Sequence, residues 1–442
     1  MKLTIVIVFL LGYLLISLES NLKVNKTAIA LLLSVVLWTL YSCSLAAYAP
    51  DGISLKEFQD TIINIHFVKH LGDTGEIIFF LLGAMTIVEV VDANGGFNFV
   101  RQKLATRSKH TMLWRVVVVT FLLSAILDNL TTSIVMIMVL RKLVQSRGDR
   151  LIYAALVIIS ANSGGAFSPI GDVTTIMLWI KGVITTQGVI SEIFIPSLVS
   201  MLIPAFILSL QLEGKFDKEQ NLPKADVTQF TKVQRDIIFW LGVGGLIFVP
   251  IFKTLTHLPP FMGILLVLGI LWTTTEIFHY NTAEDDTMAK RVSDIMTKID
   301  LSTIMFFLGI LMAVAVLQEV GVLTMLGKGL DTTFEGNHYL VTGIIGVLSS
   351  IVDNVPLVAG CMGMYPVQAA GDLAVDGIFW QLLAYCAGVG GSMLIIGSAA
   401  GVVVMGLEKI TFGWYMKKVT WIVFVGYLAG IFTYWLEKTF LF

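Results

Sequence analysis

The stretches FLLSAILDNLTTS at residues 121–133 and GVLSSIVDNVPLV at residues 346–358 each place an aspartate followed by an asparagine inside an apolar segment. The two pairs are Asp128–Asn129 and Asp353–Asn354. An ionisable side chain in the hydrocarbon of a membrane costs several kcal/mol, and it therefore usually marks a functional site. Both pairs are candidate functional residues.

The similarity between the two stretches extends along the chain. Gly83 in FFLLGAM corresponds to Gly309 in FFLGILM, and ANSGGAFSPIGD at 161–172 corresponds to AGVGGSMLIIGS at 387–398. Corresponding positions are separated by 225 or 226 residues throughout. A constant spacing of this kind indicates an internal repeat, so the sequence predicts two copies of one half.

The composition predicts an all-α polytopic membrane protein. Of the 442 residues, 56% are hydrophobic and 14% are charged, and the mean hydropathy is +0.85. Several apolar runs reach the length of a membrane-spanning helix, about 20 residues. The net charge of −2 and the lack of a long basic block argue against nucleic acid as a partner. Cys43, Cys361 and Cys386 show no paired or metal-binding spacing, so free thiols are expected.

Apolar runs of spanning length predict five spans in each half. Those of the first half, 1–213, are 3–19, 26–46, 76–92, 151–182 and 191–213. Those of the second half, 235–442, are 235–252, 259–277, 300–319, 378–408 and 413–437. The first run could also be a signal peptide, but no small-x-small cleavage site follows it, and we expect a retained span.

Between the third and fourth spans of each half lies an apolar segment that the Asp–Asn pair interrupts, 111–145 or 338–370. We expect each segment to be a re-entrant hairpin, because a straight span would place its carboxylate in lipid. Residues 94–109 and 320–334 are expected to be short amphipathic helices at the membrane interface. Residues 214–234 are expected to form a cytoplasmic linker.

Most of the 29 lysines and arginines lie in alternate connecting segments: 20–27, 93–115, 141–150, 214–235, 278–299 and 407–418. Under the positive-inside rule these segments are cytoplasmic. Both chain ends then lie outside the cytoplasm, hairpin 111–145 opens to the cytoplasm and hairpin 338–370 to the exterior. Because five spans per half is an odd number, the second repeat is predicted to be inverted, which places substrate sites near the midplane. A cell inner (plasma) membrane fits this bias.

The fourth span of each half, 151–182 or 378–408, contains residues that a continuous helix does not tolerate cheaply. In the first half they are Gly164, Gly165, Pro169 and Gly171. Each span is predicted to break into two half-helices, which a membrane tolerates only around a polar cavity. Oxygen-bearing side chains stand at the breaks: Asn162, Ser163, Asp172, Thr174, Thr175, Ser392 and Ser398.

Gathered near the midplane, these groups form an oxygen-rich site without a thiol or imidazole cluster. Hard cations prefer such ligands, and the carboxylates of Asp128, Asp172 and Asp353 would repel an anion. Burial and like-charged neighbours raise the pKa of a carboxylic acid, so protonation competes with a bound cation. This competition is the minimal chemistry of cation/proton exchange, and it requires no resident cofactor.

Each candidate also has a structural interpretation. Asp128 and Asp353 could cap the helices that follow them, and the glycines could serve close helix packing. Asp172 stands at the start of a half-helix, where a carboxylate is favoured whatever the substrate. Ser392 and Ser398 could bond back into their own helices.

At these residues the chain resembles the sodium/proton antiporters of the NhaD type, within the ion transporter superfamily. The match runs through GAMTIVE (83–89), ILDNLTTS (126–133) and the long, specific SANSGGAFSPIGDVTTIMLWI (160–180), and it covers essentially the whole chain. The resemblance implies a scaffold domain and a transport domain of hairpins and broken helices, usually in a homodimer that works by an elevator-like shift.

By motif position, the resemblance implies ion-site residues at Asp128, Asn129, Asn162, Asp172, Thr174, Thr175, Asp353 and Asn354, followed less securely by Ser350, Ser392 and Ser398. The first four of these are expected to bind the transported Na⁺. After its asparagine, the first hairpin has Thr131 and Thr132, whereas the second has Val355 and Pro356. The two halves are therefore not expected to contribute equally.

The sequence thus predicts a transporter rather than an enzyme, namely a secondary Na⁺/H⁺ antiporter that also accepts Li⁺. The nearest alternative is a dicarboxylate, citrate or arsenite carrier on the same scaffold. Such dicarboxylate carriers typically have Ser-Asn-Thr where Asp–Asn stands here, and a serine can donate to a substrate carboxylate whereas an ionised aspartate cannot. An intramembrane aspartyl protease gives no reason for two Asp–Asn hairpins, and a non-transporting receptor would not need broken helices.

Overall fold

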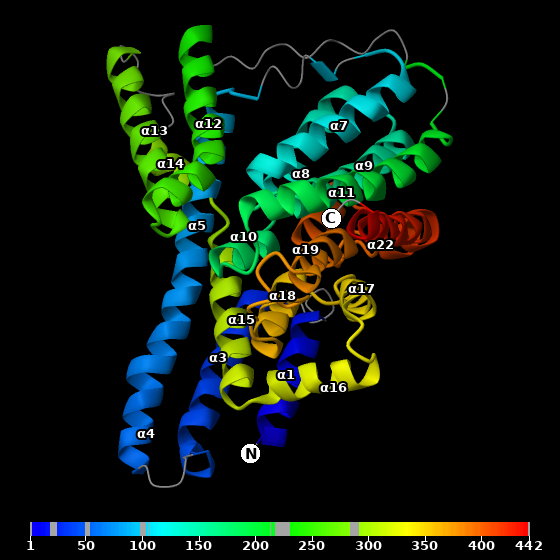
Figure 1. Cartoon of the computed structure of the whole chain (residues 1–442). Helices are drawn as coiled ribbons and strands as arrows, with labels where there is room; N and C mark the ends of the chain where they lie inside the picture. Colours follow the sequence, from blue (N-terminus) through cyan, green and yellow to red (C-terminus); the bar gives the residue numbers. More distant parts are fainter. Residues whose placement is uncertain are drawn as a thin grey trace. The chain divides into compact units, whose positions relative to one another are not determined.

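The chain is a helical, polytopic membrane protein. The computed structural model describes residues 2–17, 24–48, 54–97, 103–104, 106–212, 214–216, 230–282 and 291–440. Most of these residues lie in helices (Figure 1), and isolated β-bridges join Ser108 to Lys215 and Gln368 to Ala374. Within the described ranges, eight helical stretches are long and apolar enough to cross a membrane: Lys26–Cys43, Leu55–Ala93, Lys109–Leu127, Thr186–Ser209, Lys232–Thr256, Pro260–Tyr280, Leu301–Glu319 and Phe412–Phe440.

Residue contacts divide the chain into two units, each of which draws segments from both halves of the sequence. Unit 1 comprises Met1–Leu82, Asp300–Asn337 and Val355–Val367. Its helices are α1 (Lys2–Ser17), α3 (Lys26–Cys43), α4 (Leu55–Thr61), the start of α5 (Val68–Ala93), α15 (Leu301–Glu319), α16 (Val322–Thr333) and most of α18 (Asn354–Met364). Helices α3 and α15 pack along each other.

One predicted span is part of a longer helix. The apolar run at 76–92 lies within a helix that extends from Leu55 to Ala93 and includes a π-helical segment, Ile62–Phe67. The sequence prediction began too late because polar residues interrupt the apolar pattern of the preceding turns, among them His66, Lys69, His70 and Asp73. These polar residues lie on a continuous helix and not in a loop.

The two predicted interfacial helices differ in outcome. Helix α16 confirms a short helix within 320–334. Residues 94–97, by contrast, form a turn, so the prediction of a helix over 94–109 is wrong at its start. Residues 98–102 and 105 of that segment lie outside the described residues.

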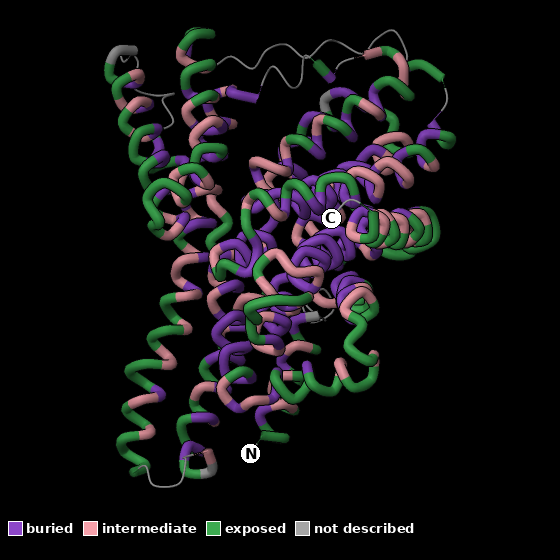
Figure 2. Tube along the Cα trace, in the orientation of Figure 1, coloured by how far each residue is buried: buried purple, intermediate pink, exposed green. Residues whose placement is uncertain are grey.

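Unit 2 comprises Gly83–Ile299, His338–Asn354 and Gln368–Phe442, and it contains the end of α5. Its other helices are α7 (Lys109–Leu127), α8 (Asn129–Leu143), α9 (Arg147–Ala166), α10 (Val173–Ile180), α11 (Thr186–Ser209), α12 (Lys232–Thr256), α13 (Pro260–Thr282), α14 (Val292–Met296), α17 (His338–Leu348), α19 (Ile378–Gly390), α20 (Ala399–Glu408), α21 (Phe412–Tyr415) and α22 (Trp421–Phe440). Every residue of α9 from Tyr153 and of α19 from Phe379 onward is buried (Figure 2). These two helices form the core of the unit.

Both predicted helix breaks are present. Helix α9 ends at Ala166 and α10 begins at Val173, while α19 ends at Gly390 and α20 begins at Ala399. The residue that precedes each second half-helix, Asp172 or Ser398, has an extended backbone, with φ/ψ of −146°/145° and −142°/153° respectively. Each of these residues caps its half-helix through a side-chain oxygen. The two breaks therefore share one local geometry at corresponding positions of the sequence.

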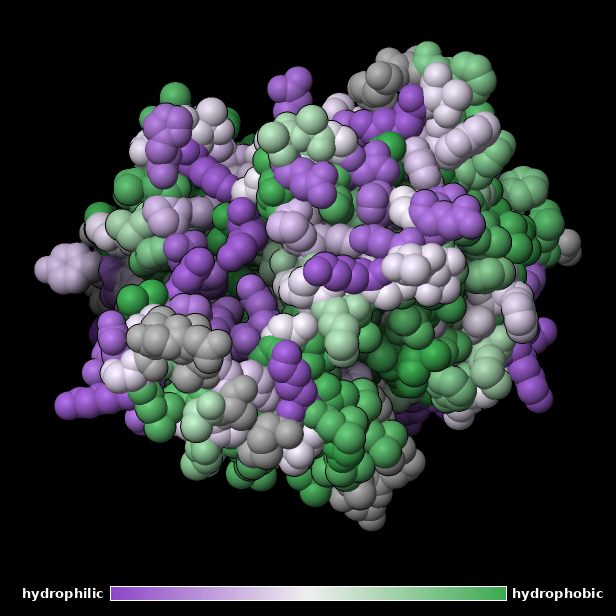
Figure 3. All heavy atoms as spheres, turned by 60° about the horizontal axis from the view of Figure 1, so that its bottom comes forward, coloured by the Kyte–Doolittle hydropathy of each residue, from purple (hydrophilic) through white to green (hydrophobic). Residues whose placement is uncertain are grey.

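Large apolar side chains cover much of the surface. On α3 and α12, for example, Leu32, Val35, Trp240 and Leu255 are exposed, and Figure 3 shows broad hydrophobic areas between hydrophilic residues. A water-soluble protein rarely exposes contiguous apolar patches of this extent. The lipid bilayer is the environment that such a surface requires.

Two glycines allow close packing of the core helices. Helix α7 approaches α9 so closely that a Cβ atom at Gly164 would overlap the carbonyl oxygen of Phe121, and α17 approaches α19 so that a Cβ at Gly390 would overlap the carbonyl oxygen of Gly346. Because the obstructing atoms belong to the backbone, no side-chain rotation relieves the overlap. The glycine-packing interpretation thus holds at these two positions.

The Gly164→Ala variant is expected to destabilise unit 2 by about 1–3 kcal/mol, because overpacking forces the backbones of α7 and α9 apart. Thermal unfolding of the purified protein in detergent measures the effect. Gly148→Ala is the matched control, since it lies on the same helix and a Cβ there meets no atom within 4 Å. Equal stability of the two variants would contradict the packing argument.

Candidate functional site

Polar side chains gather at the two helix breaks of unit 2. Asn129, the first residue of α8, donates from Nδ2 to Oδ1 of Asn162 at 3.0 Å and to Oδ2 of Asp172 at 2.6 Å. All three residues are at least 96% buried, with exposed fractions of 4%, 0% and 1% respectively. Hydrogen bonds at such depth fix the relative positions of α8, α9 and the start of α10.

Asn162 also links the two halves of the sequence. Its Nδ2 donates to Oγ of Ser392 and to Oγ of Ser398, both at 2.9 Å. With the bond that its Oδ1 accepts from Asn129, the amide uses both of its hydrogens and its oxygen. Asn162 is therefore the central residue of the network.

Asp172 carries the negative charge of this network. Its Oδ1 accepts hydrogen bonds from the backbone N and the Oγ1 of Thr174, each at 3.0 Å, and Nδ2 of Asn354 lies 3.4 Å from Oδ1 and 3.5 Å from Oδ2. Thr175 donates through Oγ1 to the backbone carbonyl of Asp172 at 2.8 Å. All of these donors are neutral, so the charge of the carboxylate is solvated by dipoles and not by a basic side chain.

Asp128 separates α7 from α8 and has an unusual backbone, with φ +77° and ψ 158°. Its side chain caps α8, since Oδ1 accepts from the backbone N of Thr131 and Oδ2 from Oγ1 of Thr131, both at 2.8 Å. The capping interpretation of this residue is therefore observed. The carboxylate nevertheless interacts electrostatically with Asp172, which in turn interacts with Asp353. Asp172 is therefore the aspartate within electrostatic range of both others.

Ser350 is a predicted site residue whose side chain does not bond to the network. Its hydroxyl donates to the carbonyl of Val347 at 2.7 Å, within its own turn. The structural interpretation of Ser392 and Ser398 was that their hydroxyls bond back into their own helices. Both hydroxyls, however, accept a hydrogen bond from Asn162 on α9. The structure thus distinguishes three serines that the sequence could only group together.

Two serines that the sequence analysis did not identify donate hydrogen bonds to the backbone of α9 and α19, the helices that lead into the breaks. Ser124 on α7 donates to the carbonyl of Ala161 at 2.6 Å, and Ser349 donates to the carbonyl of Ala387 at 2.8 Å. Ser124 and Ser349 are both fully buried. The two serines occupy corresponding positions of the stretches 121–133 and 346–358, so the repeat itself contained the signal.

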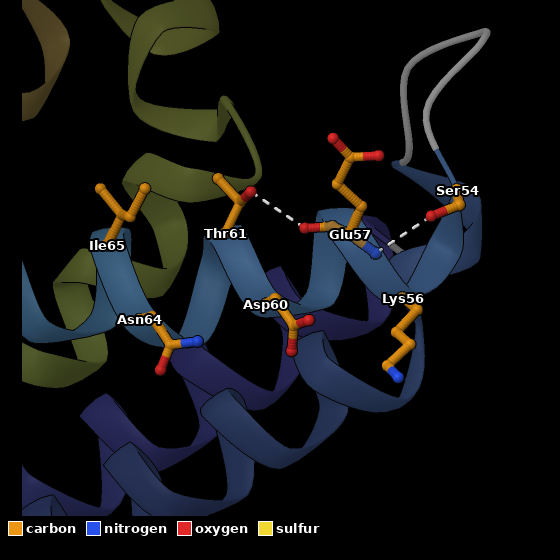
Figure 4. A pocket seen from close by; sticks show the side chains of 7 residues that line it. All are labelled: Ser54, Lys56, Glu57, Asp60, Thr61, Asn64 and Ile65. Carbon is orange, nitrogen blue, oxygen red and sulfur yellow. Dashed lines mark hydrogen bonds between the residues drawn. The ribbon is translucent and has the colours of Figure 1, made fainter.

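Two other features would indicate a binding site, a cluster of metal-binding side chains or a surface hollow. Among the described residues, no group of three or more His, Cys, Asp or Glu side chains could hold a metal ion. A hollow in unit 1 runs along α4 (Figure 4), where Ser54 accepts from the backbone N of Glu57 and Thr61 donates to the Glu57 carbonyl. These bonds lie within one helix and its N-cap. They account for the hydroxyl groups of Ser54 and Thr61 in that hollow without a ligand.

A polytopic helical protein whose interrupted helices enclose buried polar side chains belongs to the class of membrane transport proteins. The sequence matches the citrate transporter family model over residues 13–382. Sodium/proton antiporter 2 of Arabidopsis thaliana is 41% identical over 430 residues, covering 97% of this chain and 98% of that protein. The chain belongs to the citrate transporter family and, within it, to the NhaD-type sodium/proton antiporters.

Two further relatives extend this similarity. Sodium/proton antiporter 1 of Arabidopsis thaliana is 45% identical over 429 residues, which cover 97% of this chain and 71% of that protein. The Na⁺/H⁺ antiporter NhaD of Alkalimonas amylolytica is 30% identical over 463 residues, covering 96% of this chain and 88% of that protein. The alignments span both helix breaks.

The Asn162→Leu variant is expected to lower the melting temperature of the protein, because it removes three buried hydrogen bonds, to Asn129, Ser392 and Ser398, and a buried polar group left unsatisfied costs about 1–3 kcal/mol. Asn94→Leu is the matched control, since Asn94 is also buried but donates only to the Val90 carbonyl one turn before it. An Asn162 variant no less stable than the control would show that the network does not hold the breaks together.

Proposed function

We propose that this protein is a secondary antiporter that exchanges Na⁺ for H⁺, and Li⁺ in place of Na⁺. The observation that carries the proposal is the carboxylate of Asp172, which is buried among neutral donors within electrostatic range of two further aspartates. A buried carboxylate with other carboxylates near it attracts a hard cation, and protons compete with the cation for the same oxygens. The relatives are named as sodium/proton antiporters, which supports the exchange of Na⁺ for H⁺.

In this mechanism Asp172 and Asp128 bind the cation and take up protons when it leaves. The amides of Asn129, Asn162 and Asn354 have both a donor and an acceptor end. An amide whose nitrogen points toward Asp172, as that of Asn129 does, stabilises the carboxylate by donating to it. If the amide group rotates by 180°, its oxygen points toward the site and binds a cation. The hydroxyls of Thr174 and Thr175 complete the shell, and Asp353 adds the charge of the second half.

The proposal includes an arrangement in the membrane. The two halves are inverted repeats of five spans, with re-entrant hairpins at 111–145 and 338–370 and a linker at 214–234. The equal spacing of the breaks and the matching caps of Asp172 and Ser398 support this arrangement, as does the distribution of lysine and arginine. Both termini then lie outside the cytoplasm of a plasma membrane, and the protein works as a homodimer.

The Asp172→Asn and Asp128→Asn variants are expected to abolish Na⁺-driven proton flux in everted vesicles, because neither carboxamide can exchange a proton for a cation. Asparagine is also a good N-cap residue, so the capped helices remain and expression stays normal. Ser350→Ala, whose hydroxyl bonds only within its own turn, is the control and should retain the wild-type rate. Full exchange by Asp172→Asn would remove that residue from the mechanism.

A carrier for citrate or another dicarboxylate is the second candidate, because the matching family model is that of citrate transporters. The purified protein in liposomes with an internal pH-sensitive dye separates the two functions. Na⁺ and Li⁺ are expected to collapse an imposed pH gradient, whereas citrate, succinate and arsenite are expected to have no effect. A response to citrate in the absence of Na⁺ would favour the second candidate.

A further inference from the structure

An ion-pair cluster around one buried carboxylate lies at the C-terminal end of α20. The side chain of Glu408, the last residue of this helix, is only 1% exposed. Its Oε1 accepts from Nε of Arg141 at 2.7 Å and its Oε2 from Nε of Arg150 at 2.6 Å. We call these three residues the Glu408 clamp.

The guanidinium groups of the clamp also bind the main chain. Arg141 donates through Nη2 to the carbonyl of Leu407, and Arg150 donates through Nη1 to the carbonyl of Val144 at 3.0 Å. The clamp therefore ties the end of α20 to the turn between α8 and α9 by both charge and backbone hydrogen bonds. Charge-assisted bonds of this kind are stronger than neutral ones.

Three helices connect the Glu408 clamp to the candidate site, and each contributes one residue at either end. These pairs are Arg141 and Asn129 on α8, Arg150 and Asn162 on α9, and Glu408 with the N-cap Ser398 on α20. Ten to twelve residues of α-helix span about 15–18 Å. Helix α20 packs against both α8 and α9, so the clamp closes one end of a three-helix group and the polar network closes the other.

The segment after the C-terminal end of α10, the second half-helix of the first break, is also anchored. Shortly after α10, Thr185 donates to Asp376 from its backbone N at 2.7 Å and from Oγ1 at 2.6 Å, and Gln381 of α19 donates to the same carboxylate at 2.7 Å. Each second half-helix is thus fixed at its far end to a segment of the opposite half of the sequence. Only the anchor of α20 uses two arginines.

We propose that Glu408 is a positioning residue of the candidate site. It does not touch the site but holds the C-terminal end of α20, whose N-cap Ser398 belongs to the site. A helix of ten residues is stiff, so fixing its end at Glu408 fixes Ser398 at its start, and Ser398 holds the amide of Asn162. Asn162 in turn orients Asn129 against Asp172. This inference rests on the proposed function, because it assigns to the clamp a role in binding Na⁺.

The test compares Glu408→Gln with Asp149→Asn. Asp149 lies in the first turn of α9, next to Arg150 of the clamp, and pairs with a basic residue, Lys109 at 2.7 Å, but it takes no part in the clamp. Glu408→Gln is expected to raise the Na⁺ concentration for half-maximal exchange by about tenfold, the low end for residues that orient ion ligands. The maximal rate should change little, and Asp149→Asn should behave as wild type.

A second measurement does not depend on transport. In Glu408→Gln, the backbone amide of Gly401, which donates to Oγ of Ser398 at 3.1 Å, is expected to exchange its hydrogen faster in mass-spectrometric hydrogen exchange. A role confined to stability would lower the melting temperature and leave both the Na⁺ dependence and this exchange unchanged, and that result would overturn the inference. If Glu408→Gln fails to fold, Arg141→Lys keeps the charge but loses the planar fork and should shift both readouts in the same direction.

The two proposals fail in different ways. If the wild-type protein shows no Na⁺-dependent proton flux, the proposed function is wrong, whereas hydrogen exchange at Gly401 still reports whether the clamp positions α20. If the wild type responds to Na⁺ and Glu408→Gln keeps its Na⁺ dependence and its exchange rate, only the role of the clamp is refuted.

Discussion

The constraint on which this structure depends is that a helix interrupted inside a membrane must find partners for the backbone groups it releases, since no water is available there. At both breaks the residue before the second half-helix supplies a side-chain oxygen to a released amide, Asp172 for Thr174 and Ser398 for Gly401. The same two residues also bind the asparagines of the network. The polar site is therefore built largely from the side chains that satisfy the backbone groups released at the breaks.

This double use explains the asymmetry between the halves. The cap of α10 is a carboxylate and the cap of α20 is a hydroxyl, although the backbone angles of Asp172 and Ser398 differ by less than 10°. The local geometry is thus satisfied by either residue, and of the two caps only that of α10 is a carboxylate. Asn162 compensates for this difference, because its oxygen faces the amide of Asn129 and its nitrogen faces the two serines.

The sequence predicted the parts of the fold that depend on local chemistry. The density of glycine and proline between Gly164 and Gly171 was enough to place the first break, and the oxygen-bearing residues around it do converge. The hydrogen-bond partner of each serine could not be predicted in this way. Ser350 bonds to a carbonyl of its own turn, whereas Ser398 bonds to Asn162 of another helix, and only the folded structure shows which partner is within reach. The Glu408 clamp was also out of reach, since its arginines lie more than 250 residues from Glu408 in the sequence.

The backbone of Asp128 provides the strongest argument that the charges serve more than folding. A positive φ combined with an extended ψ is a region that only glycine occupies readily, and other residues are held there at a cost of about 1–3 kcal/mol. A glycine at this turn would remove that cost, and a serine or asparagine would cap α8 as well as an aspartate does. The strain applies to any residue other than glycine, and an aspartate adds to it a repulsion from Asp172. Capping alone does not require a charge at this position, and the proposed binding of a cation by Asp128 supplies a reason for one.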